Sequence, residues 1–146
     1  MKRRIAFSLL LSGLLCASFQ VVSKTPFDPV DFIKKMPYQQ VVKELALARC
    51  ISQVSTEDTL FSLDAARIAN AMEEWMPFDA ENGEQKVNAL IDKFKSTYNP
   101  AHLEVGPDTK GVTLNCLRLY HSPELDKLSR EVINGDPDHT WYQDNP

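Results

Sequence analysis

The chain has 146 residues, 43% of them hydrophobic and 25% charged, and this length matches one domain with one core. Its 16 Lys and Arg are outnumbered by 20 Asp and Glu, and the resulting formal net charge of −4 argues against a nucleic-acid partner, since such binding depends on Lys and Arg contacts to phosphate. An acidic chain is compatible with a basic protein partner, although mild acidity is also common in soluble proteins without one.

Residues 1–23 are typical of a cleaved secretory signal. Three basic residues at positions 2–4 precede an apolar stretch at 5–16, and small residues suitable for cleavage follow at Ser18 and Ser23. The apolar stretch is too short to span a bilayer, which takes about 20 residues. Cleavage after either serine is compatible with this pattern. We therefore expect an exported protein with no membrane association after cleavage.

Export has consequences for charge and for the cysteines. A lipid anchor at Cys16 is not expected, because a bacterial lipoprotein signal requires a small residue where Leu15 stands. Removal of the signal takes three basic residues and no acid, so the formal charge falls from −4 to −7. The mature chain keeps Cys50 and Cys116 in an oxidising compartment, where thiols pair by default.

The body of the chain begins after an irregular lead-in at residues 24–37, which contains three prolines and one predicted helical turn at 30–35. Apolar residues then recur at three- and four-residue spacing over 38–54, which predicts a helix. A second helix is predicted to be capped by Ser55 or Thr56 and to stop at Pro77, and a third runs from near Asp79 to Asn99. Their apolar stripes are Phe61, Ala65, Ile68, Ala69, Met72, Trp75 and Met76, followed by Val87, Leu90, Ile91, Phe94 and Tyr98.

A long segment without helical periodicity follows at residues 99–111, with two prolines and two glycines. Loops of about this length are uncommon unless they are functional or disordered. A fourth helix is predicted over 112–120. Ser122 is expected to cap a fifth helix, with Pro123 at its first position, where a missing N–H costs nothing.

The chain shows no internal repeat or low-complexity tract, and a polar tail at 134–146 ends it. Whether Trp141 and Tyr142 in this tail dock on the body stays open at this point. The predicted fold is an all-α, compact bundle of about five helices within residues 38–133.

A disulfide between Cys50 and Cys116 is expected to join the first and fourth helices. It would close a loop of about 65 residues and add about 4 kcal/mol in the chain-entropy model. Two reduced, buried thiols acting as small apolar fillers are the alternative.

Catalytic and metal sites are not indicated. Cys116 and His121 lie about 140° apart around a helix axis and do not face each other, and His102, His121 and His139 lack metal-ligand spacing. The acidic pairs Glu73–Glu74 and Asp136–Asp138 are expected to be solvated. No phosphate-binding glycine loop or nucleophile elbow occurs, so we predict a binding protein with no cofactor. The cluster Met72, Trp75, Met76 and Phe78 is interpreted as core, with a partner surface as the alternative.

The run at residues 115–128, Asn–Cys–Leu–Arg–Leu–Tyr–His–Ser–Pro–Glu–Leu–Asp–Lys–Leu, resembles immunity proteins that neutralise type VI secretion amidase effectors of the fourth family. Residues 46–51 and 64–66 are shorter matches, and the likeness covers most of 38–133. The tail past Asn134 is a departure.

The resemblance implies a small periplasmic all-α protein that forms a homodimer and is bridged by a cysteine pair like Cys50–Cys116. It implies a cognate amidase effector as partner, an enzyme with a Cys–His dyad that cuts the γ-D-glutamyl–diaminopimelate bond of peptidoglycan stem peptides. It also implies that the loop before the Cys116 helix plugs the amidase cleft.

The loop at 99–111 is the only segment that fits this role, and its composition suits inhibition. The residues expected to contact the partner are His102, Leu103, Glu104, Val105, Gly106, Pro107 and Asp108. A connector without function is the alternative for the loop. For the whole chain, the alternatives are a periplasmic binding or chaperone-like domain with another ligand and, more distantly, a peptidoglycan enzyme.

Overall fold

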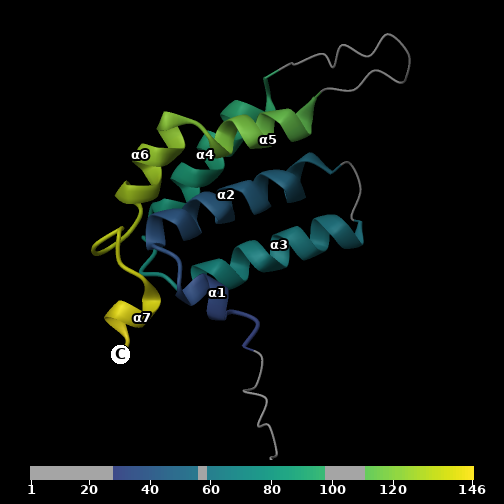
Figure 1. The fold of residues 1–146 in the computed structure, drawn as a ribbon. Coiled ribbons are helices and arrows are strands. Elements are labelled where there is room, and N and C mark those ends of the chain that lie inside the picture. The colour runs from purple at the N-terminus through teal and green to yellow at the C-terminus, as the bar shows by residue number, and fades with distance from the viewer. Residues whose placement is uncertain (1–27, 56–58, 98–110) are drawn as a thin grey trace, which may run out of the picture.

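Residues 28–55, 59–97 and 111–146 are described by a computed structural model, and Figure 1 shows their arrangement. The larger helices are α2 (Tyr38–Val54), α3 (Leu60–Glu73), α4 (Gly83–Lys95), α5 (Val112–Tyr120) and α6 (Pro123–Glu131). Two single-turn helices, α1 (Asp31–Lys34) and α7 (Trp141–Asp144), flank them. Over these residues the β-structure is limited to isolated bridges. The predicted all-α bundle of about five helices is confirmed.

α2 is the central helix of the bundle. It packs against α3, α4, α5 and α6, and in Figure 1 it lies between α3 on one side and α4 and α5 on the other. Val41, Val42, Leu45 and Cys50 on this helix are 0% exposed. Burial of each large aliphatic side chain stabilises the fold by about 1.5–3 kcal/mol, so α2 is the helix on which the others assemble.

α3 begins later than the sequence pattern indicates. Thr59 is its N-cap, and Thr59 and Ser62 form a capping box in which each side chain accepts the other residue's backbone N–H. Ser55 instead ends α2 with extended backbone. The predicted cap at Ser55 or Thr56 is therefore wrong, because the reciprocal bonds further along the chain fix the helix start at Leu60.

The remaining helices begin at polar or glycine signals in the sequence. The Asp79 carboxylate accepts the N–H groups of Glu81 and Asn82, and this turn leads into α4. Ser122 accepts the N–H of Leu125 at 3.1 Å, which caps α6 as predicted. α5 begins at Val112 and ends at Tyr120, as predicted.

The disulfide joins α2 to α5. The Sγ atoms of Cys50 and Cys116 are bonded at 2.05 Å, the Cα atoms are 5.6 Å apart, and both residues are 0% exposed. The predicted pairing is confirmed, and two reduced thiols are excluded. The bridge fixes the middle of α5 against the last turns of α2, close to the stem at the start of α5.

The cluster from Met72 to Phe78 belongs to the core. Met72 and Met76 are buried, and Trp75 and Phe78 pack against the buried cluster from its edge. The reading of this stripe as core is confirmed. Among the described residues, no helix is long and apolar enough to cross a membrane.

Candidate partner-binding site

The predicted contact residues fall in a segment that the structure leaves undescribed. His102, Leu103, Glu104, Val105, Gly106, Pro107 and Asp108 all lie outside the described residues. The two stems from which this segment departs are described: one follows α4 and reaches Thr97, and the other begins at Gly111 and enters α5. The geometry of the site is therefore that of its stems and of the surface beside them.

A buried amide ties the two stems together. Asn115 Nδ2 donates to the carbonyl oxygen of Thr97 at 2.6 Å, and Asn115 is 1% exposed. The next residue along α5 is Cys116, which is bonded to Cys50 of α2. Loss of the acceptor of this buried amide would cost about 1–3 kcal/mol of stability. The contact therefore holds the two ends of the loop close together, next to the disulfide.

Gly111 sets the direction in which the chain enters α5. It is the N-cap residue of that helix, with φ 62° and ψ 30°, in the left-handed region that residues with a Cβ rarely adopt. Its carbonyl accepts the N–H of Asn115 at 3.2 Å. The glycine thus permits a sharp turn immediately before the first helical residue.

Most of the exposed large apolar side chains of the described residues lie on α3 and α5. Of the seven large hydrophobic residues that are exposed in the described part of the chain, five lie on α3 and α5; these are Leu60, Phe61, Leu63, Leu114 and Leu117. Leu60 is 88% and Phe61 69% exposed. Figure 1 shows that α3 and α5 begin at the same end of the bundle, where α2 ends. Apolar surface of this kind marks contact sites for other proteins.

A shallow groove follows the exposed side of α2. Its volume is ≈ 240 Å³, and it is lined by Glu44, Leu47, Ala48, Ile51, Met72 and Tyr120. The lining comes from α2, α3 and α5 and is mainly apolar. The Tyr120 hydroxyl at its rim accepts from Gln40 Nε2 at 2.8 Å. The groove suits apolar contacts with a protein surface better than binding of a polar small molecule.

The residues considered for catalysis are not arranged for it. Cys116 is held in the disulfide and cannot act as a nucleophile. His121 is the C-cap residue that follows α5, and its ring lies edge-on to Tyr120, with ring centroids 5.0 Å apart. Over the described ranges, no group of three or more His, Cys, Asp or Glu could hold a metal ion.

The comparisons with known proteins agree with this picture of a binding protein. The model of a family described as type VI secretion system amidase immunity protein, Tai4, matches residues 40–129. The chain belongs to this family. The resemblance stated from the sequence is thereby confirmed, and so is the prediction that the chain is not an enzyme.

Two solved structures resemble this Tai4 family member. One comes from work on new Type VI-secreted toxins and self-resistance proteins in Serratia marcescens; it is 65% identical, covers 86% of this chain and 98% of its own, and has a TM-score of 0.75. The other is the effector–immunity system Tae4/Tai4 from Salmonella typhimurium, at 17% identity, with coverage of 71% and 95% and a TM-score of 0.60. The second likeness shows the fold alone. No curated protein matches the chain.

Within the Tai4 match lies an ion pair that joins three helices. Arg49 of α2 is 8% exposed, and its Nη2 lies 2.6 Å from Glu73 Oε1 of α3 and 3.9 Å from Glu84 Oε1 of α4. Its buried Nη1 has no hydrogen-bond partner in the described part of the chain. Glu73, which was expected to be solvated, is thus half-buried and paired.

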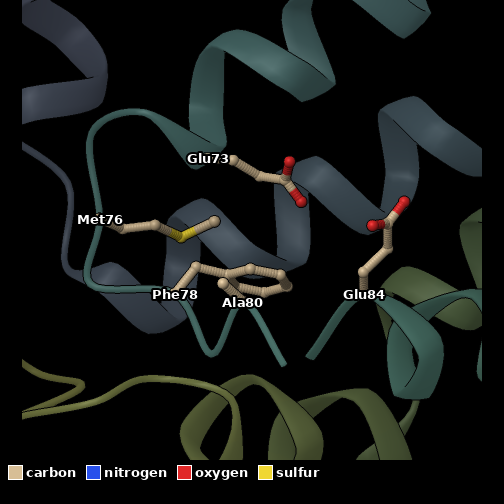
Figure 2. A pocket seen from close by; sticks show the side chains of 5 residues that line it. All are labelled: Glu73, Met76, Phe78, Ala80 and Glu84. Atoms are coloured by element: carbon tan, nitrogen blue, oxygen red, sulfur yellow. The ribbon is translucent and has the colours of Figure 1, made fainter. Parts of the chain in front are cut away.

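The two carboxylates of this ion pair also line a small pocket. Figure 2 shows Glu73 and Glu84 beside the Phe78 ring, in a pocket of ≈ 230 Å³ that Met76 and Ala80 complete. A Cβ added to Gly83 would lie 2.9 Å from the Phe78 ring, so glycine allows α4 to approach it this closely. The pocket is small and the charges that line it are already paired, so we assign it a structural role.

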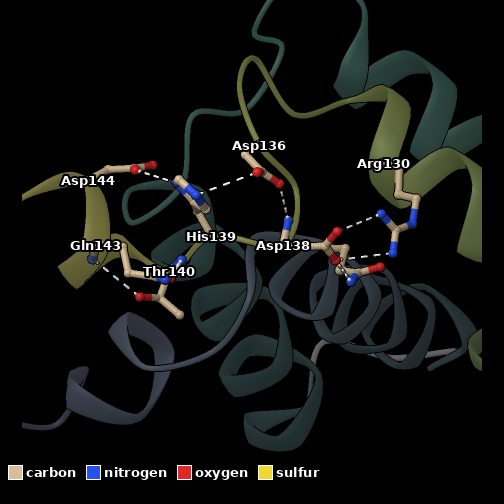
Figure 3. A network of polar contacts seen from close by, with 8 residues as sticks. Arg130, Asp136, Asp138, His139, Thr140, Gln143 and Asp144 are labelled. Atoms are coloured by element: carbon tan, nitrogen blue, oxygen red, sulfur yellow. Dashed lines mark hydrogen bonds and ion pairs between the residues drawn. The ribbon is translucent and has the colours of Figure 1, made fainter.

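The tail beyond the residues matched by the Tai4 model packs against the helical body, a point that the sequence left open. Trp141 packs edge-on against Trp75 with ring centroids 5.5 Å apart, and Lys34 lies 4.1 Å from the Trp75 ring centroid. Figure 3 shows the polar contacts of the same segment, which include a capping box formed by Thr140 and Gln143. The Thr–x–x–Gln spacing was the signal available in the sequence.

Proposed function

We propose that this chain binds a cognate type VI secreted peptidoglycan amidase of the Tae4 kind and blocks its active-site cleft with the loop at residues 99–111. The observation that carries the proposal is the tie between the loop stems, in which buried Asn115 holds Thr97 beside the Cys50–Cys116 bridge. A loop held at both ends loses less conformational entropy on binding than a free segment, which favours tight association.

α5, which carries one of the stems, extends the proposed contact surface. Its exposed Leu114 and Leu117 would bury apolar area around the inserted loop. The formal charge of −7 expected after signal cleavage favours a basic amidase, because opposite fields raise the rate of encounter. Glu104 and Asp108 are the loop acids proposed to face a cleft that contains a catalytic histidine.

We place this action in the periplasm, after cleavage of the signal at residues 1–23. A buried disulfide is consistent with an oxidising compartment, and the family acts against effectors that attack peptidoglycan. We further propose a homodimer with C2 symmetry, in which the exposed apolar faces of two α3 helices pair; C2 dimers are common among soluble proteins.

The test is replacement of His102–Asp108 by a Gly/Ser linker of equal length. Cells that produce the amidase in the periplasm should lose protection, while the disulfide and the thermal unfolding midpoint of the variant stay unchanged. The matched control replaces the exposed turn at residues 80–82 in the same way and should keep full protection. Full protection by the loop variant would reject the loop as the inhibitor, and a stable complex with a different ligand would favour the alternative of a binding or chaperone-like domain.

A further inference from the structure

The C-terminal segment caps the central helix. The first N–H groups of a helix have no intrahelical acceptor, and at the start of α2 the N-cap residue Pro37 offers no side-chain acceptor. The tail supplies two: the carbonyls of His139 and Pro137 accept the N–H groups of Tyr38 at 2.8 Å and Gln39 at 2.9 Å. The tail therefore completes the start of the helix on which the core is built.

The capping segment is held by a histidine between two carboxylates. His139 Nδ1 lies 2.8 Å from Asp144 Oδ1, and His139 Nε2 lies 3.5 Å from Asp136 Oδ2, as Figure 3 shows. Ionised carboxylates only accept hydrogen bonds. A neutral imidazole has one N–H and no charge, so it can donate to Asp144 but does not attract Asp136. The imidazolium donates to Asp144 and also forms an ion pair with Asp136 across the 3.5 Å contact. Both contacts are therefore favourable only when the ring is doubly protonated.

The other charged groups around this histidine do not replace the missing proton. The charged groups that act on His139 are Asp136, Asp138 and Asp144 of the tail. From the neighbouring helices, Tyr38 of α2 bonds to Asp144 and Arg130 of α6 pairs with Asp138. Arg130, the only cation among them, is paired at 3.1 Å with both oxygens of Asp138. The hydrogen bond with Asp144, aided by the charges of Asp136, Asp144 and Asp138, raises the pKa of His139.

The same segment also fastens the N-terminal turn. The Tyr142 hydroxyl donates to Asp31 Oδ1 at 3.0 Å, and Lys34 Nζ lies over both the Trp75 and the Trp141 ring, 4.1 and 5.1 Å from their centroids. A change in the tail would reach α1 through these contacts and α2 through the two capping bonds.

We propose that residues 136–144 form a pH-responsive clasp, closed on α1 and on the start of α2 when His139 carries two ring protons and loosened when it carries one. Because the pKa of the folded state is raised, the stabilisation is complete below the ordinary histidine value of about 6.5 and is lost as pH rises through the folded value. The clasp is distinct from the proposed inhibitory loop. The loop stems follow α4 and precede α5, whereas the clasp lies against α1 and the start of α2.

Hydrogen exchange of the Tyr38 and Gln39 amides tests the clasp directly, because the tail carbonyls protect both. Protection factors, each referred to the unstructured rate at the same pH, should fall about 3- to 10-fold between about pH 5.5 and about pH 8 in the native chain. In His139→Gln they should be low and independent of pH. The control His121→Gln, at an exposed histidine, should keep the native profile.

A second variant covers the case in which His139→Gln does not fold. Asp136→Asn keeps an oxygen that can accept the Asp138 N–H but removes one of the two charges, so the fall in protection should shrink at least about twofold. The proposal is overturned by native protection factors that do not change with pH. It is also overturned if the folded His139→Gln chain shows a fall with pH as large as that of the native chain. If His139→Gln does not fold, the same result in Asp136→Asn overturns it.

Discussion

Arg49 is buried and paired with Glu73, and neither its burial nor its pairing could be predicted from the sequence. It stands beside Cys50 in one of the runs that carry the family resemblance, and the sequence gives no sign that it is buried or that Glu73 is its partner. The pairing joins residues that lie 24 positions apart on two helices. Spacing within one helix cannot reveal such a contact, because it depends on how α2 and α3 pack.

Replacement of Arg49 by Ala should lower the free energy of unfolding by about 2 kcal/mol. This is below the 3–5 kcal/mol typical of a broken buried pair, since Glu73 keeps 29% of its side chain exposed and can be solvated. Urea unfolding measures the change. Arg67→Ala, at an exposed position on α3, is the control and should shift stability by less than about 0.5 kcal/mol. Equal effects for the two variants would contradict the role given to the ion pair.

Helices were predictable where the apolar spacing and a local signal at the helix boundary agree. Pro37 before α2 and Pro123 at the start of α6 mark both starts, and α5 has the predicted bounds. The start of α3 was missed because its cap is a Thr–x–x–Ser box, which lacks the usual Glu or Gln at the fourth position. The docking of α7 stayed open because its contacts join distant parts of the chain, such as the hydrogen bond between Tyr142 and Asp31, which are 111 positions apart.

Thr59→Ala should lower the free energy of unfolding by about 1 kcal/mol, because the N–H of Ser62 loses its side-chain acceptor. The loss should be read from urea midpoints and compared with Thr113→Ala, an exposed threonine inside α5. That second substitution should cost less than about 0.5 kcal/mol. A cost at Thr59 no larger than at Thr113 would show that the capping box does not stabilise α3.

At the scale of the whole molecule, the disulfide joins the central helix to the helix that carries one loop stem. The sequence was sufficient to predict this bridge, since an export signal leaves two cysteines in an oxidising compartment. It was not sufficient to predict that Asn115 beside the bridge ties the loop stems, because the acceptor is the backbone carbonyl of Thr97, and a backbone acceptor leaves no mark in a sequence. The loop contacts themselves stay a prediction.

The double variant Cys50→Ala/Cys116→Ala should unfold with a free energy about 4 kcal/mol lower than the native chain, because the unfolded state is no longer constrained by a loop of 66 residues. Urea unfolding of the native chain with and without reductant is the control, since the reduced chain should resemble the variant. A difference under about 1 kcal/mol would mean that the bridge contributes little to the scaffold.

Phe61→Asp tests the proposed dimer, because the substitution places a charge on the apolar face of α3, where Phe61 is 69% exposed. Light scattering of the eluted protein should give a dimer for the native chain and a monomer for this variant. Phe32→Asp, at an exposed aromatic residue of α1, should leave the dimer intact. A native monomer, or an unchanged dimer in Phe61→Asp, would reject the proposed pairing through α3.

The most direct test of the inhibitory loop is the rate at which the purified cognate amidase cleaves muropeptides, titrated with this protein. The native chain should abolish turnover near equimolar concentration. The chain with His102–Asp108 replaced by a Gly/Ser linker should need at least about 100-fold more protein for the same inhibition, equivalent to a loss of about 2.7 kcal/mol in binding. Equal inhibition by both proteins would show that the amidase cleft is blocked by some other surface.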